Sequence, residues 1–126
     1  MTQFSIKEIL NLTKEWILNG NLNPDILAES FQLISPFWKS NNREEVIEKF
    51  QTSNAYREVL GNIVHFDPVL DFIGLDGVHF AIIFQYHTKN SSHVFETLLC
   101  RVSNGLLVEL RSIYDLAETK EAHGLN

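Results

Sequence analysis

Five histidines and a single cysteine are the first side chains of this chain to consider as metal ligands or nucleophiles. The histidines show neither His-x-His nor His-Glu-x-x-His spacing, and Cys100 has no second thiol to form a ligand pair. Cys100 also lies among apolar residues in a stretch typical of a strand, which favours a buried, inert thiol over a nucleophile. His87 and His93 flank a predicted turn and could face each other, although histidines are common at hairpin ends. The sequence therefore predicts no metal site.

Two further kinds of reactive site also lack their sequence pattern. No Gly-x-Ser-x-Gly elbow is present, so a serine hydrolase is not indicated. No glycine-rich loop follows a predicted strand, so we expect neither a bound nucleotide nor another cofactor. The remaining chemistry would come from an ionisable group that lines a cavity and has a shifted pKa. The candidates for that group are His65, Asp71, His79, Glu96 and Asp115.

The composition of the 126 residues fits one globular domain, because 44% of them are apolar and 21% are charged. Acidic residues outnumber basic residues by 16 to 10, which gives a net charge of −6. That balance argues against nucleic acid or an anionic membrane as a partner, because both require clustered Lys and Arg. There is no apolar run of about 20 residues and no basic-then-apolar start, so we expect neither a membrane span nor a secretory signal. Together with the single cysteine, these features predict a cytoplasmic protein.

The N-terminal part of the chain carries strong helix-start and helix-stop signals. Ser5 and Glu8 form a capping box, apolar residues follow at helical spacing, and Gly20 suits the left-handed position after a helix end. These signals predict a helix over 5–19. The next expected elements are a short helix that starts at Asn23-Pro24, a strand over 30–35 that ends at Pro36, a helix capped by Asn42 and a helical turn over 55–60.

The remainder of the chain is rich in β-branched and aromatic residues, and turn signals divide it. Asp76-Gly77 and Asn104-Gly105 are strong hairpin dipeptides, and a polar break separates two further apolar runs. Strands of about ten residues exceed the usual five or six, so the sheet must twist and bend. We expect an antiparallel meander of four strands near 63–75, 78–88, 93–103 and 106–115. The prediction is one α+β domain over 1–115, with about three helices on a bent sheet of four to six strands, and a polar tail over 116–126 that frays.

Several phrases of the sequence resemble one superfamily of α+β proteins. Residues 16–22 are similar to the opening helix and turn of the cystatin-like/nuclear-transport-factor-2-like fold, and residues 27–30 with Ser35-Pro36-Phe37-Trp38 are similar to its first strand. Residues 101–115 resemble the last hairpin of its SnoaL-like group, in which a turn with glycine leads into a strand that ends in aromatic-Asp. The resemblance implies a cone of helices packed on a strongly bent, mainly antiparallel sheet. Members include steroid isomerases, polyketide cyclases, epoxide hydrolases, dehydratases, binding proteins and scaffolds, so the fold does not fix the function.

Carried over residue by residue, the resemblance implies that the known acid–base groups are missing. The general-base Asp of the isomerases matches Ser35, and their protonated Asp falls near Thr97. Their oxyanion-hole Tyr falls near Thr13 or Trp16. The Asp that cyclases and epoxide hydrolases place in the last strand matches Ser112. A serine does not act as a resting base near neutral pH, so these schemes are not expected here.

The cone implied by the resemblance would still offer an apolar pocket for a ligand. One face of the last strand carries Leu106, Val108, Leu110, Ser112 and Tyr114. The other face is charged and suits the outside, and the resemblance also places the Ser112 face inward, where hydroxyls offer hydrogen bonds rather than proton transfer. The alternative is that apolar side chains fill the cone and leave no cavity. For the strand over 93–103 we expect the inward set to be His93, Phe95, Thr97, Leu99 and Arg101, with Arg101 at the exposed rim. The predicted ligand-binding residues are Trp16, Phe31, Ser35, Thr97, Leu110, Ser112 and Tyr114.

Three functions stay open at this point. The chain is expected to bind a small, apolar or partly polar molecule; alternatively, it is an enzyme of isomerase, polyketide-cyclase or dehydratase type with a non-standard acid–base residue, or an interaction or scaffold module. A cavity with a buried carboxylate or histidine would favour the enzyme. The strand over 78–88 is apolar on both faces, so its sequence does not show which face is inward. A second copy that covers the outer face of the sheet would account for both apolar faces, and the resemblance also implies a homodimer.

Overall fold

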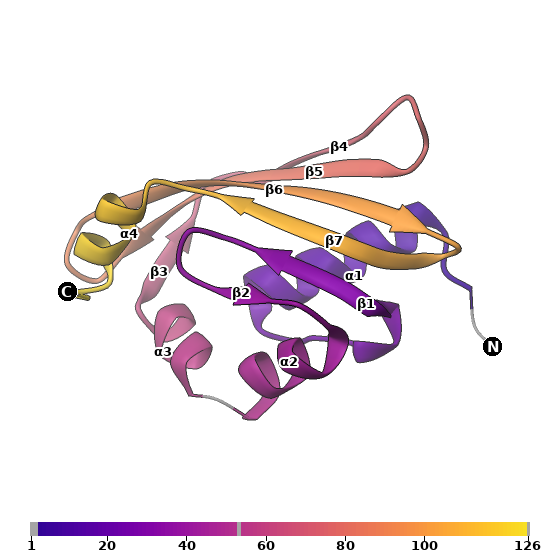
Figure 1. Cartoon of the computed structure of the whole chain (residues 1–126). Coiled ribbons are helices and arrows are strands. Elements are labelled where there is room, and N and C mark those ends of the chain that lie inside the picture. The colour runs from indigo at the N-terminus through magenta and orange to yellow at the C-terminus, as the bar shows by residue number, and fades with distance from the viewer. Residues whose placement is uncertain (1–2, 53, 126) are drawn as a thin grey trace.

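Helices lie against one face of a long bent sheet in this computed structural model, which describes residues 3–52 and 54–125 (Figure 1). The first helix is α1 (Ile6–Asn19). A capping box fixes its start, because Glu8 N–H donates to Ser5 Oγ at 3.1 Å and Ser5 N–H donates to Glu8 Oε1 at 2.9 Å. Gly20 ends it in the left-handed region, at φ 78°. The predicted helix over 5–19 is confirmed to within one residue.

The next segment forms two strands and several short helical turns. The predicted caps are present: Asn23 accepts from Asp25 N–H and Asn42 accepts from Glu45 N–H, both at 3.0 Å. Only one helical turn follows Asn23, so the first strand begins earlier than the predicted residue 30. In chain order the elements are a 3₁₀ turn (Pro24–Ile26), β1 (Leu27–Ile34), β2 (Lys39–Ser40), α2 (Arg43–Ile47), a π-helical turn (Glu48–Thr52) and α3 (Ala55–Gly61).

Seven strands form one bent, unclosed sheet within the described ranges, which is more than the four to six expected. The order across the sheet is β2-β1-β7-β6-β5-β3, and β4 also pairs with β5. The predicted strand over 63–75 is divided into two strands, because Pro68 has no amide hydrogen to donate to β5. The later strands are β3 (Ile63–Phe66), β4 (Leu70–Ile73), β5 (His79–Thr88), β6 (His93–Ser103) and β7 (Leu106–Ile113).

β1 and β7 pair in parallel, with Leu33 beside Leu110. The predicted antiparallel meander is confirmed for β3–β7, and the parallel pair lies outside it. A parallel pair needs a long crossover between its strands, and the chain from β2 to β6 supplies it. The α+β class and the mainly antiparallel, strongly bent sheet are as predicted.

Side chains alternate along β5 and β6 between the concave face, which the helices cover, and the outer face. The even-numbered residues from Phe80 to Tyr86 are buried on β5, and those from Val94 to Val102 face the same side on β6. A shift of one residue exchanges the two faces of a strand, and both faces of β6 contain apolar residues, so the sequence pattern did not decide between them. The inward set predicted for this strand was wrong, because His93, Phe95, Thr97 and Leu99 lie on the outer face. Arg101 lies on that face too and is exposed, as expected for it.

In β7, Leu110 and Ser112 are buried on the concave side, as predicted. A bulge between Arg101 and Val102 shifts the pairing near the start of the strand. Leu107 is therefore the buried residue there, in place of Leu106.

A fourth helix, α4 (Leu116–Ala122), begins two residues after β7, so the expectation of a fraying tail was wrong for 116–122. Asn126 lies outside the described residues. Asp115 caps the helix and accepts a hydrogen bond from Glu118 N–H at 2.9 Å. An Asp three residues before a Glu is a helix-start signal, which the sequence analysis did not use.

Two asparagines attach α4 to the rest of the fold. The Asn62 amide donates to the carbonyl oxygen of Ala122 at 3.0 Å, and the Asn90 amide donates to that of Glu121 at 3.1 Å. The Ala122 side chain is fully buried. The helix thus covers one end of the concave face (Figure 1). Among the described residues, no helix has the length and apolar character needed to cross a membrane.

Candidate functional site

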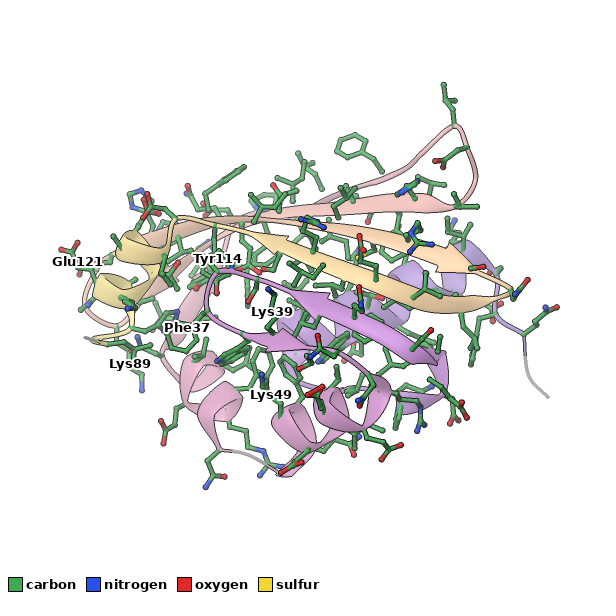
Figure 2. All side chains as sticks on the ribbon, viewed as in Figure 1. Phe37, Lys39, Lys49, Lys89, Tyr114 and Glu121 are labelled. Atoms are coloured by element: carbon green, nitrogen blue, oxygen red, sulfur yellow. The ribbon has the colours of Figure 1, made fainter. Side chains whose placement is uncertain are left out.

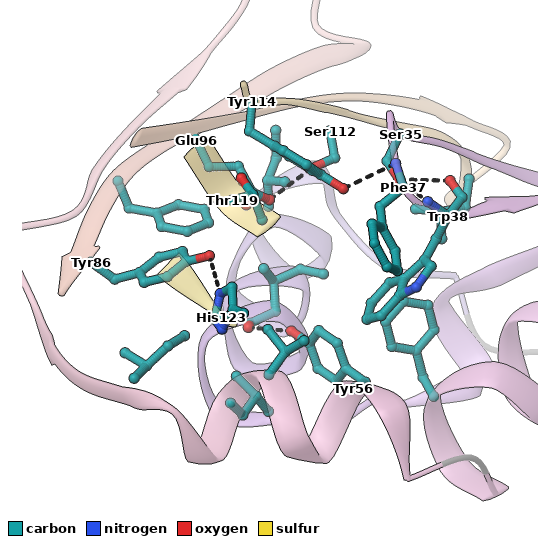
Figure 3. A pocket seen from close by; sticks show the side chains of 18 of the residues that line it. Ser35, Phe37, Trp38, Tyr56, Tyr86, Glu96, Ser112, Tyr114, Thr119 and His123 are labelled. Carbon is teal, nitrogen blue, oxygen red and sulfur yellow. Dashed lines mark hydrogen bonds between the residues drawn. The ribbon is translucent and has the colours of Figure 1, made fainter. Parts of the chain in front are cut away.

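The concave face of the sheet and the helices that cover it line a partly open cavity of about 90 Å³ (Figure 3). Ligand pockets commonly have volumes of roughly 300–1,000 Å³, so this cavity is smaller than most and has room only for a small molecule. Most of its wall consists of aliphatic and aromatic side chains from α1, α3, β1, β5, β6 and β7. The polar side chains in the wall are Ser35, Tyr56, Tyr86, Glu96, Ser112, Tyr114, Thr119 and His123.

Glu96 brings a carboxyl group into this mostly apolar wall. It lies on the concave face of β6, opposite Phe84 of β5, and Ser112 Oγ donates a hydrogen bond to its Oε2 at 2.7 Å. Burial disfavours the charged form and raises the pKa of Glu96 to about 7, against the opposing effect of the Ser112 hydrogen bond. At neutral pH the carboxyl is therefore present in both its protonated and its ionised form.

The two serines of the wall use their hydroxyls within the protein. Ser112 lies opposite Leu98 of β6, so Glu96 is its diagonal neighbour and receives its hydrogen bond. Ser35 Oγ donates to the Trp38 carbonyl oxygen at 2.6 Å and accepts from Trp38 N–H at 2.7 Å, which closes the turn between β1 and β2. These hydroxyls orient protein groups, whereas the sequence analysis expected them to face a ligand.

Two tyrosines of the wall are attached to neighbouring backbone groups. Tyr114 Oη accepts from Phe37 N–H at 3.1 Å, and Figure 2 shows both residues where the end of β7 meets the β1–β2 turn. Burial raises the pKa of Tyr114. Tyr56 donates its hydroxyl hydrogen to the Ile17 carbonyl oxygen of α1. Tyr56 is thereby committed as a donor, and Tyr114 as an acceptor.

A histidine and a third tyrosine meet at the α4 end of the cavity. Tyr86 Oη and His123 Nε2 are 2.8 Å apart (Figure 3), and His123 Nδ1 is 3.2 Å from Asn62 Nδ2. Burial lowers the pKa of His123, which favours the neutral ring, and burial raises the pKa of Tyr86, which keeps the phenol protonated. His123 belongs to the segment expected to fray, so its place in the cavity wall was not predicted.

The predicted ligand-binding residues divide into two groups. Thr97 is paired with Ile83 and Ile113 on the outer face of the sheet, away from the cavity. Trp16 and Phe31 belong to the core beneath it. The residues that the structure does bring together in the wall are Ser35, Leu110, Ser112 and Tyr114.

Trp16 and Phe31 are fully buried core residues. The Trp16 ring makes edge contacts with Phe31 and Phe50, at centroid distances of 6.2 and 5.1 Å. Phe50 lines the cavity, whereas Trp16 does not. The indole N–H of Trp16 has no hydrogen-bond partner among the described residues. Helical spacing identified the buried face of α1, but it did not show whether core or cavity lies against that face.

Of the five ionisable candidates, Glu96 lines the cavity and the other four lie away from its wall. In the described ranges, no three His, Cys, Asp or Glu side chains are grouped so that they could hold a metal ion. Cys100 is buried and free, and burial raises the pKa of its thiol. The four candidates outside the wall have local roles. His65 Nε2 lies 3.4 Å from Asp67 Oδ1, and Asp71 Oδ2 lies 2.8 Å from Lys14 Nζ. His79 contacts Asp76, and Asp115 caps α4.

The sequence matches no protein-family model, and no curated protein is significantly similar to it. Solved structures are similar in shape. A protein with a ketosteroid isomerase-like fold from Catenulispora acidiphila, in complex with trimethylamine, has a TM-score of 0.62 at 18% identity over 97% of this chain and 95% of that one. A candidate polyketide cyclase from Pseudomonas putida has a TM-score of 0.67 at 14% identity, over 94% and 98%. A nuclear-transport-factor-2-like protein of unknown function from Mesorhizobium loti has a TM-score of 0.64 at 18% identity, over 86% and 89%. These likenesses show the fold: the chain has the nuclear-transport-factor-2-like, SnoaL-like cone.

Proposed function

We propose that this protein binds a small, mostly apolar molecule in the cavity and that Glu96 transfers a proton to or from it. The observation that supports the proposal is the carboxyl group with a pKa of about 7 in a mostly apolar wall. An acid–base catalyst is most effective when its pKa lies near the operating pH, because it can then both accept and release a proton. Two of the similar structures are described as a candidate polyketide cyclase and a protein with a ketosteroid isomerase-like fold, which fits an enzyme of isomerase, cyclase or dehydratase type.

The same wall argues against an anionic ligand. The described wall residues include neither Lys nor Arg. A second negative charge beside Glu96 would have no cation to offset its loss of hydration. We therefore expect the proton to move to or from a neutral molecule.

The first experiment follows hydrogen–deuterium exchange of acetophenone in D₂O at pD 7 by proton NMR. Glu96 would remove a proton from the methyl carbon next to the carbonyl, the electron pair of the C–H bond would move toward the carbonyl oxygen, and a deuteron would return to carbon. Glu96→Gln should lower the protein-dependent exchange rate by about 10²-fold or more. The matched control is Glu29→Gln, an exposed position on β1, which should exchange like the wild type.

Two outcomes would contradict the proton-transfer proposal. Exchange that is as fast in Glu96→Gln as in the wild type would show that Glu96 is not the acid–base group. If acetophenone perturbs the amide signals of the cavity wall but its exchange is no faster with the protein present, the protein binds the molecule without transferring a proton.

We also propose that two copies of the chain pair through the outer face of the sheet. Support comes from the apolar side chains that remain uncovered on that face, with exposures between 37% and 57%. Monomers rarely expose large contiguous apolar patches, and such patches mark interaction sites. The strand register places these residues on neighbouring strands. The uncovered residues are Leu70, Phe72, Phe95, Leu99 and Ile113.

Light scattering coupled to size exclusion should give a particle of twice the chain mass of 14.5 kDa. Phe95→Glu places a charge in the patch and should convert this particle to a monomer. Arg57→Glu, at an exposed position of α3, adds the same side chain elsewhere and should leave the dimer intact. A wild-type monomer at high protein concentration would refute the dimer.

For the location of the protein we propose the cytoplasm. The single cysteine is free and buried, as expected for a protein that folds in a reducing compartment. Fractionation of cells that express the tagged chain tests this directly, and recovery with secreted material would contradict it.

A further inference from the structure

The hydrogen bonds at the α4 end of the cavity have a direction that follows from the atoms involved. Asn62 Nδ2 lies 3.0 Å from the Ala122 carbonyl oxygen, which only accepts, so the amide nitrogen of Asn62 must face α4. The same nitrogen lies 3.2 Å from His123 Nδ1 and is a donor only, so Nδ1 must be the acceptor. A neutral histidine that accepts at Nδ1 carries its hydrogen on Nε2.

This tautomer determines what the Tyr86 hydroxyl does. His123 Nε2–H donates to Tyr86 Oη at 2.8 Å, so the phenol is the acceptor in this pair. The hydroxyl hydrogen of Tyr86 is not donated to any of the residues that the structure describes. Tyr86 is 4% exposed and lines the cavity, so a molecule inside the cavity is the natural acceptor for that hydrogen. A buried donor without a partner is costly, and a ligand oxygen would remove this cost.

We propose that Tyr86 donates a hydrogen bond to an uncharged oxygen of the ligand, such as a carbonyl oxygen, and that His123 and Asn62 are positioning residues that keep its hydrogen free for this purpose. The inference rests on the proposed function, because it takes the cavity as the ligand site. It also narrows the ligand class to mostly apolar carbonyl compounds. Charge that develops on the carbonyl oxygen when Glu96 removes a neighbouring proton would be stabilised by this bond.

Asn62→Asp gives a test that needs no ligand. A carboxylate at position 62 only accepts, so it would draw the histidine hydrogen to Nδ1. His123 Nε2 would then accept from Tyr86, and the phenol hydrogen would no longer be free. Ring nitrogen NMR shifts of ¹⁵N-labelled His123 should show the Nε2–H tautomer in the wild type and the Nδ1–H tautomer in Asn62→Asp. An Nδ1–H tautomer in the wild type would overturn the inference.

The second test compares acetophenone with α-methylstyrene, in which a CH₂ group replaces the carbonyl oxygen at nearly the same shape. One neutral hydrogen bond corresponds to about a three- to tenfold preference for acetophenone in the wild type. The carbonyl stretch of ¹³C-labelled acetophenone should also move to lower frequency on binding. Tyr86→Phe and Asn62→Asp should both lose the preference and the frequency shift.

Two controls separate this bond from general effects. Asn90→Asp also loses a hydrogen bond to a carbonyl oxygen of α4, so it controls for loosening of the helix and should behave as the wild type. Tyr114→Phe removes another phenol of the cavity wall, whose oxygen accepts from Phe37 N–H, and should keep the preference. Loss of the preference in Tyr114→Phe, with its retention in Tyr86→Phe, would overturn the assignment. Equal affinity of the wild type for both probes would refute the inference but leave the cavity as a ligand site, whereas binding of neither probe would refute both.

Discussion

Glu96→Gln is expected to stabilise the protein at pH 8 and to leave its stability almost unchanged at pH 4. In the folded protein the pKa of Glu96 is about 7, against an ordinary value of 4.5, so the folded state holds this proton more tightly than the unfolded state. The wild type should therefore lose stability as the pH rises from 4.5 to 7, because the folded chain must then keep a buried carboxylate. The difference corresponds to about 3 kcal/mol in the free energy of unfolding.

Urea unfolding at pH 4, 6 and 8 measures this pH dependence. In Glu96→Gln, residue 96 should contribute almost no change in stability between pH 4 and pH 8. Glu29→Gln, at an exposed site, should follow the wild type. Ser112→Ala should move the stability loss to higher pH, because the Ser112 hydrogen bond lowers the pKa of Glu96. If stability changed with pH equally in the wild type and in Glu96→Gln, the pKa of Glu96 in the folded protein would have its ordinary value. That result would also remove the support for proton transfer.

Trp16→Ala is expected to lower the free energy of unfolding by about 3–5 kcal/mol. The ring is fully buried and packs edge-on against Phe31 and Phe50, so its removal leaves a void that the surrounding core fills only in part. Trp16→Phe should cost much less, because it retains one ring and loses no hydrogen bond of the indole nitrogen.

Chemical denaturation followed by circular dichroism measures this loss, and acetophenone binding is compared for the variants that stay folded. Trp38→Ala is the matched comparison, because Trp38 lines the cavity and is only half-buried. It should cost less stability than Trp16→Ala but change binding more than Trp16→Phe. If Trp16→Phe is stable but does not bind acetophenone, Trp16 belongs to the ligand site, which would contradict its assignment to the core.

Local signals in the sequence predicted the helical and turn elements well. Ser5, Gly20, Asn23 and Asn42 act through their own backbone neighbours, so their effect is visible without knowledge of the tertiary fold. The pairing of β1 with β7 and the faces of β6 depend on contacts between distant segments. A period-two pattern shows these faces only where one of them is polar.

The candidate site was predicted in part for the same reason. Ser112 and Tyr114 belong to a strand with one charged face, so alternation placed them inward. Glu96 was named as a candidate group for a cavity, but the inward set predicted for its strand was the opposite one. Leu98 and Cys100 are buried and lie on the same face of β6 as Glu96. A prediction that placed these two residues inward would have placed Glu96 inward as well. His123 depends on α4, and the polar composition of that segment hid its attachment to Asn62.

The parallel pairing of β1 with β7 also sets an order of events during synthesis. Leu33 and its partner Leu110 are 77 positions apart in the chain, so β1 leaves the ribosome long before the strand that covers its edge. Until then β1 carries an open edge that other nascent chains can pair with. The wall residues Glu96, Ser112 and His123 emerge late as well. A ligand can therefore bind in the complete cavity only after the chain has been made as far as His123, so it cannot protect the earlier intermediates from aggregation.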